Sequence, residues 1–215
     1  TGTQPESGPA QVPGLDPFAV KKPTGAYAWS LGAALTPLVN MGLGDGEVVE
    51  GVYAGGGFGV NLFANFIYKA EQQLGLQGFI SFANIPASDN DVDPLNIVDF
   101  GGALYKHFPL TDKIDITPLL GLQVSLMQPE LDTDESFVSV GFRLQGSIDY
   151  HLGADKKHVF SFSPGIKGYR GSSSSTDFGP EAFGLDTGGV ILEFGFGYQY
   201  RFTSPFGSSP LFTLE

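Results

Sequence analysis

The sequence predicts an all-β chain that closes into an eight-stranded antiparallel transmembrane β-barrel. Eight segments alternate apolar and polar residues with a period of two, as strands with one apolar and one polar face do. These segments are roughly 10–15 residues long, whereas globular strands average about 5–6 and a tilted strand crossing a bilayer needs about 9–11. Short and long connections also alternate strictly along the chain, which is typical of transmembrane barrels.

The first four strands are expected in the N-terminal half. Apolar residues at every second position of Trp29–Leu35 mark the first strand. Phe58–Tyr68 alternates less cleanly, because Phe63 and Ile67 interrupt its polar face. The third and fourth strands are Leu74–Asn84 and Ile97–Phe108.

The last four strands show the pattern most clearly. Val138–Leu152 alternates over its whole length, and Ile114–Leu126 does so except at Leu119. His158–Arg170 is the seventh strand. The eighth strand, Gly189–Phe202, has one aromatic face and one polar or glycine-containing face. Its apolar face and that of Val138–Leu152 are predicted to contact lipid, through Phe142, Leu144, Phe194, Phe196, Tyr198 and Phe202.

Charge follows the division between short and long connections. The short connections are 70–73, 109–113 and 153–157, and the long ones are 38–56, 85–94, 128–136 and 171–188. More than half of the 23 acidic residues lie in the long connections, which contain no Lys or Arg. The net charge of −12 therefore belongs to the end of the barrel that carries the long loops.

Composition excludes several classes of protein. The 215 residues include 31 Gly and 19 Phe but no Cys, which excludes a disulfide scaffold and a thiolate zinc site. The acidity argues against nucleic-acid binding. No apolar run of about 18 residues exists, so no transmembrane helix is expected.

Three regions are expected. Residues 1–24 contain five prolines and predict an extended periplasmic arm. Residues 25–202 form the barrel, and residues 203–215 are a C-terminal tail or a linker.

The turn Phe108–Lys113 and the aromatic final strand Phe194–Phe202 resemble small outer-membrane barrels of the OmpA, OmpX and OmpW type. The resemblance implies the outer membrane of a Gram-negative bacterium. An even number of strands returns the chain to its starting side, so both termini are expected in the periplasm. The sequence departs from the pattern because residues 203–215 follow the aromatic strand.

Charged residues on the polar strand faces are predicted to form a network in the lumen: Arg143, Asp149, Glu193, Arg201, Asp115 and Lys167. Buried charges must be paired or hydrated. The main interpretation is a structural network of salt bridges and water, because an eight-stranded barrel is just wide enough for side chains to fill. The alternative is a narrow, gated ion path.

No catalysis is expected, and no cofactor or defined metal site. His107, His151 and His158 fall at the short-turn end, whereas related lipid-modifying barrels place a catalytic His near the extracellular side. The acidic loops are interpreted as exposed to solvent. The alternative is that they bind divalent cations loosely at the lipopolysaccharide surface.

The predicted function is a structural or interaction role: membrane stabilisation, adhesion, or association with lipid, lipopolysaccharide and neighbouring barrels. The alternative is a narrow pore or a channel for small apolar solutes. Small residues on apolar faces, Ala33, Gly102 and Gly146, also suggest a homo-oligomer.

Overall fold

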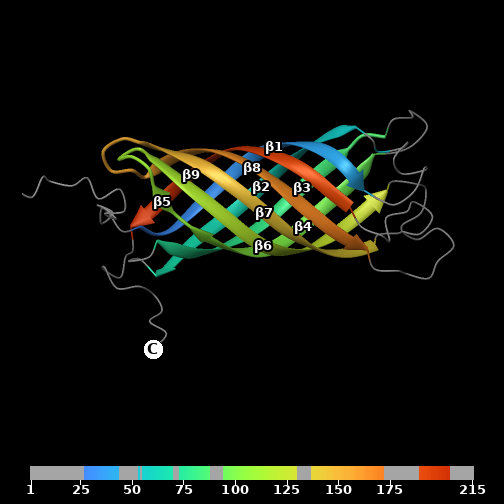
Figure 1. Ribbon diagram of the computed structural model, residues 1–215, viewed down its shortest axis with the longest axis horizontal. Coiled ribbons are helices and arrows are strands. Elements are labelled where there is room, and N and C mark those ends of the chain that lie inside the picture. Colours follow the sequence, from blue (N-terminus) through green and yellow to red (C-terminus); the bar gives the residue numbers. More distant parts are fainter. Residues whose placement is uncertain are drawn as a thin grey trace, which may run out of the picture.

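The protein is a β-barrel whose long strands cross the barrel axis obliquely (Figure 1). The computed structural model describes residues 27–43, 53, 55–69, 73–87, 94–129, 137–171 and 189–203. Its strands are β1 (Tyr27–Leu43), β2 (Gly56–Lys69), β3 (Leu74–Ile85), β4 (Leu95–Lys106), β5 (Phe108–Pro109), β6 (Ile114–Pro129), β7 (Phe137–Leu152), β8 (His158–Gly171) and β9 (Gly189–Thr203). Within these ranges no helix is long and apolar enough to cross a bilayer.

The sheet closes on itself. Its strands pair antiparallel in the order β4-β3-β2-β1-β9-β8-β7-β6-β5, and a β4–β6 ladder joins the two ends. The two-residue strand β5 continues β4 in the same register against β6. Counting β4 and β5 as one strand, the barrel has eight strands, and the predicted fold class is confirmed.

The strand ends differ modestly from the predicted ones. β1 continues to Leu43, so the connection predicted at 38–56 is shorter in the structure. The predicted arm, residues 1–24, lies outside the described residues, as does the predicted tail beyond Thr203.

Pro118 of β6 explains the split between β4 and β5. The ladder between these strands lacks two residue pairs, or rungs, Lys106–Pro118 and His107–Thr117, and it resumes at Phe108. Proline has no N–H, so it cannot donate the ladder hydrogen bond of its rung. The backbone therefore continues as one strand with a local gap in its hydrogen bonds.

Two further ladders show the same two-rung gap at a proline. The missing rungs are Gly146–Pro164 and Ser147–Ser163 between β7 and β8, and Thr36–Gly195 and Pro37–Phe194 between β1 and β9. The register places these residues in one continuous row across six strands, which we call the proline row: Pro37, Phe194, Pro164, Gly146, Pro118 and Lys106. All three proline rings are exposed on the outside of the barrel.

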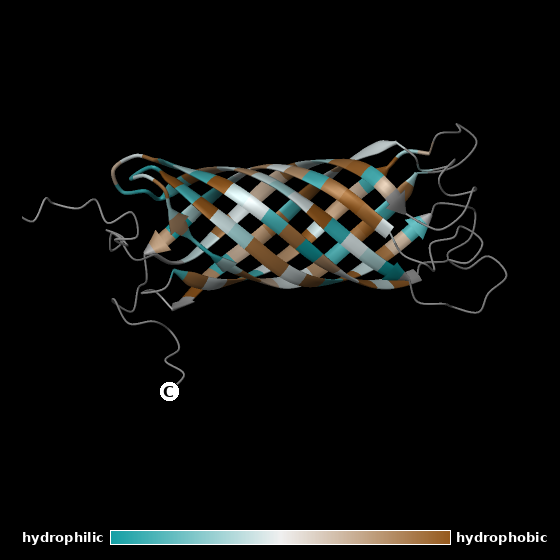
Figure 2. Ribbon diagram, in the orientation of Figure 1, coloured by the Kyte–Doolittle hydropathy of each residue, from teal (hydrophilic) through white to brown (hydrophobic). Residues whose placement is uncertain are grey.

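The outside of the barrel is apolar along most of its length. Figure 2 shows apolar residues alternating with polar ones along the strands. Leu122, in the middle of β6, is 74% exposed and is the most exposed of the large apolar side chains described. A soluble protein of this size does not expose so continuous an apolar belt, but the outside of a transmembrane barrel does.

The inside of the barrel changes character along the axis. At the end that carries the long loops, buried apolar side chains fill the lumen, and we call them the outer apolar cluster: Leu38, Tyr53, Ala83, Ile85, Leu95, Ile97, Met127, Tyr169 and Ile191. The backbone of the loop residue Tyr53 is held by a hydrogen bond of 2.7 Å from Asn40 Nδ2 to the Tyr53 carbonyl. Polar and charged side chains dominate the rest of the lumen.

Glycines on the inner face make room for large side chains. A Cβ on Gly101 would overlap the ring of Phe79, and one on Gly75 would overlap the ring of Tyr105. Both rings therefore lie across the lumen where any other residue would displace them.

Candidate functional site in the barrel lumen

Four buried charges meet below the outer apolar cluster, and we call them the central ion-pair cluster: Asp99, Arg143, Lys167 and Glu193. Arg143 binds Glu193 through two contacts, Nε to Oε1 at 2.6 Å and Nη2 to Oε2 at 3.0 Å, and neither side chain is exposed. Lys167 Nζ lies 2.8 Å from Asp99 Oδ2 and 3.4 Å from Glu193 Oε2. Two cations and two anions thus neutralise each other, which is the condition for stable burial of charge.

Neighbouring side chains hold this cluster in place. The Arg143 guanidinium lies 4.8 Å above the centre of the Phe79 ring, close enough for a cation–π interaction. Ser81 Oγ donates to Asp99 Oδ2 at 2.8 Å, and Tyr169 Oη donates to the same oxygen at 3.4 Å. These neighbouring side chains come from β3 and β8, so the cluster joins distant strands across the lumen.

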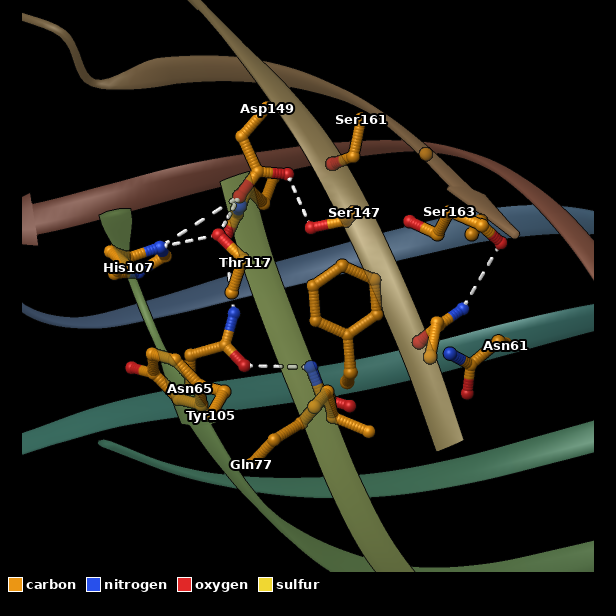
Figure 3. Close-up of a pocket in the computed structure, with 16 residues that line it drawn as sticks. Asn61, Asn65, Gln77, Tyr105, His107, Thr117, Ser147, Asp149, Ser161 and Ser163 are labelled. Atoms are coloured by element: carbon orange, nitrogen blue, oxygen red, sulfur yellow. Dashed lines mark hydrogen bonds and ion pairs between the residues drawn. The ribbon is translucent and has the colours of Figure 1, made fainter. Parts of the chain in front are cut away.

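A polar cavity of about 40 Å³ lies nearer the short turns (Figure 3). Amides line one side of it: Gln77 Nε2 donates to Asn65 Oδ1 at 2.8 Å, and Asn65 Nδ2 donates to Gln199 Oε1 at 3.0 Å. Ser147, Ser161 and Ser163 line another side (Figure 3). Since one water needs roughly 10–15 Å³ in a site with several polar partners, the cavity has room for a few water molecules.

A second charged group lies at the short-turn end, and we call it the rim cluster: His107, Asp115, Thr117, Asp149, His151 and Arg201. Thr117 Oγ1 donates to Asp149 Oδ2 at 2.7 Å. Because that hydroxyl proton is already used, His107 Nδ1, at 2.7 Å from Thr117 Oγ1, is the donor of their shared hydrogen bond.

The second histidine of the rim cluster has the opposite tautomer. Arg201 Nη1 lies 3.1 Å from His151 Nδ1, and a guanidinium can only donate. His151 Nδ1 therefore accepts, and His151 Nε2 donates to Asp115 Oδ2 at 2.7 Å. These contacts place a proton on Nδ1 of His107 and on Nε2 of His151.

The His107–Thr117–Asp149 arrangement does not have the geometry of a nucleophilic triad. In such a triad the acid orients the imidazole, and the imidazole accepts the proton of the hydroxyl. Here the Asp149 carboxylate accepts the hydrogen bond of the Thr117 hydroxyl, and the His107 imidazole donates a hydrogen bond to that hydroxyl. The adjoining cavity of about 40 Å³ has room for only a few waters and not for a substrate.

The structure divides the six predicted lumen residues between two groups. Arg143, Lys167 and Glu193 lie in the central ion-pair cluster, whereas Asp115, Asp149 and Arg201 lie in the rim cluster. All are buried except Asp115, whose side chain is 15% exposed. Sequence reasoning did not foresee the outer apolar cluster, although the isoleucines of the polar strand faces, such as Ile191, were a signal for it.

The six residues predicted to contact lipid all point away from the lumen. Phe142, Leu144, Phe196 and Tyr198 are exposed, and Phe194 and Phe202 are half-buried. Phe202 stacks on Trp29 with ring centroids 3.9 Å apart, and Tyr198 Oη lies 2.6 Å from His158 Nδ1. These aromatic contacts gather at the short-turn end, where membrane barrels carry an interfacial girdle.

The closed barrel has the fold of small eight-stranded outer-membrane proteins. Among solved structures it is similar to Neisserial surface protein A, with a TM-score of 0.55 and 11% identity over 82% of this chain and 97% of that one. OprG from Pseudomonas aeruginosa has a TM-score of 0.49 and 11% identity over 84% of this chain and 99% of that one. The attachment invasion locus protein Ail of Yersinia pestis has a TM-score of 0.45 and 14% identity over 81% of this chain and 97% of that one.

At the level of sequence, no protein-family model matches the chain, and no curated protein matches it. The comparisons with solved structures therefore define the fold of the chain alone.

A charge placed on the apolar belt tests whether that belt contacts lipid. Leu122→Arg should destabilise the protein in lipid vesicles by about 2–4 kcal/mol, the cost of a charge near the bilayer centre. Leu110→Arg is the matched control, because Leu110 is 65% exposed but lies in a turn outside the strands. Equal free energies of unfolding for the two variants, measured by urea titration, would contradict membrane placement of the belt.

Proposed function

We propose that this protein is a structural and interaction barrel of the outer membrane, with no open pore and no catalytic activity. The observation that carries the proposal is the closed lumen. The outer apolar cluster fills one level, and fully buried ion pairs fill the next. An ion would have to displace both layers to cross.

The arrangement of the lumen suits a stabilising role. Charged side chains from β4, β7, β8 and β9 bind one another across the barrel, so the polar interior joins strands that are distant in sequence. Buried networks of this kind can specify a single arrangement of the strands around them. A barrel whose strands are joined in this way is rigid and can present the long loops to partners.

We place the long loops outside the cell and the short turns and both termini in the periplasm. Short periplasmic turns and long extracellular loops are the rule for bacterial outer-membrane barrels. The acidic loop residues, such as Asp89–Asp93 and Glu130–Glu135, lie outside the described residues. Their charge supports contact with lipopolysaccharide through divalent cations, because carboxylates are preferred ligands of such ions. Association with neighbouring barrels, including a second copy, remains part of this proposal.

Planar-bilayer recording distinguishes the proposal from the alternative of a narrow pore. We expect the purified full chain to give no single-channel steps under conditions in which a general porin, used as a positive control, does. Steps that change size or ion selectivity in Arg143→Ser would show conduction through the lumen and would overturn the closed-barrel proposal.

A further inference from the structure

The proline row crosses the barrel wall diagonally. It runs from Lys106 at the short-turn end, through Gly146 and Pro164, to Pro37 in the half of β1 nearer the long loops. At each of its three gaps a proline cannot donate the ladder hydrogen bond of its rung, so the carbonyl opposite loses its donor. The three carbonyls are those of Lys106, Gly146 and Phe194.

The three carbonyls differ in what lies around them. Lys106 lies at the end of β4, and the residues that flank its gap, Tyr105, His107, Thr117 and Leu119, line the cavity. Phe194 has the buried side chains of Thr36, Leu38 and Glu193 on its inner side. Gly146 lies in the middle of the row, away from the strand ends, and has the same cavity directly behind it.

Both strands of the Gly146 gap contribute to the cavity wall. The lining includes Gln145 and Ser147 from β7 and Ser161 and Ser163 from β8. Gln145 Nε2 already donates to the Ser163 backbone carbonyl at 3.3 Å. A lumen side chain thus reaches the backbone of one of the two strands that border this gap.

Among the residues that the structure describes, none offers a donor on the outer side of the gap. Nothing lies within 4 Å of the position that a Cβ of Gly146 would occupy, and the Pro164 ring beside it is exposed. Lipid chains cannot donate a hydrogen bond, and a backbone carbonyl without a donor is strongly disfavoured in hydrocarbon. A donor must therefore come from the lumen.

We propose that the lumen cavity is a binding site for water and that one of its waters donates a hydrogen bond to the Gly146 carbonyl. Ser147 and Ser163 offer that water hydroxyl partners on either side of the gap. The volume of about 40 Å³ and the polar lining meet the usual requirements for internal water. The wall is thereby hydrated from within at the centre of the proline row, between β7 and β8.

The experiment detects bound water by magnetisation transfer from water to backbone amides in the full-length protein in detergent micelles. The amides of Lys106, Gly146 and Phe194 occupy equivalent places, each opposite a proline. We expect transfer to Gly146 and to Lys106, whose gap adjoins the same cavity, but none to Phe194, whose gap does not. Absence of transfer to Gly146, or equal transfer to Gly146 and Phe194, would overturn the proposal.

Three variants distinguish water binding in the cavity from general flexibility of the barrel strands. Pro164→Val restores the missing N–H and should abolish transfer to Gly146, and hydrogen exchange of the Gly146 amide should become about tenfold slower. Ser163→Val fills the cavity without changing the proline and should also abolish the transfer. Pro37→Val repairs the gap between β1 and β9, whose residues do not line the cavity, and should leave transfer to Gly146 unchanged. If Ser163→Val keeps the fold and full transfer, the water does not come from this cavity and the proposal is wrong.

Discussion

Replacing Glu193 by alanine should lower the free energy of unfolding by about 3–5 kcal/mol, the usual consequence of leaving a buried charge without its partner. Glu193 contacts both cations of the central ion-pair cluster, and its side chain is not exposed. Its removal would leave Arg143 with no carboxylate, whereas Lys167 would keep Asp99. Urea unfolding in lipid vesicles measures the effect, followed by the fluorescence of Trp29, the only tryptophan of the chain.

A double variant provides the control for the Glu193 prediction. Arg143→Met with Glu193→Leu removes both members of the pair and fills similar volume. Replacing a buried pair by apolar residues is often neutral or stabilising, by about 1–4 kcal/mol. We therefore expect the double variant to be at least as stable as the original protein. A single Glu193→Ala variant within about 1 kcal/mol of the original would show that the pair is hydrated rather than dry.

Leu95→Ala should destabilise the protein by about 3–4 kcal/mol, because it removes apolar contact and leaves a cavity inside the outer apolar cluster. Leu95 is fully buried at the start of β4. Leu122→Ala is the matched control, since this leucine faces outward and lipid can fill the space. It should lose only the transfer free energy of the deleted carbons, about 2 kcal/mol. Equal losses in the two variants would mean that the cluster is not packed as the structure describes.

Much of the lumen could be anticipated from the order of residues alone. Side chains alternate between the two faces of a strand, so the inward position of Arg143 and Glu193 follows from the outward position of Phe142 and Phe194. Which charge meets which could not be predicted, because partners such as Asp99 and Lys167 lie far apart in the chain. Their pairing depends on strand register and on how far each side chain reaches across the lumen.

The rim cluster is a second feature that the residue pattern does not indicate. His107 lies at the short-turn end, as the sequence predicts, but its side chain points inward and is buried. The gap at Pro118 interrupts the hydrogen bonds of this part of the strand. Contact with Thr117 and Asp149 is therefore a property of the folded wall and cannot be read from the alternation of residues.

The sequence by itself determined the architecture: eight alternating segments, apolar outside and polar inside, with the excess negative charge in the long loops. Those features are local, since they depend on side-chain parity and on the length of each connection. The proline row was decided only by the tertiary structure. Pro37, Pro118 and Pro164 lie in three separate strands, and nothing in their spacing along the chain indicates a common line. They meet in one row because closure of the barrel fixes the register of every strand against its neighbours.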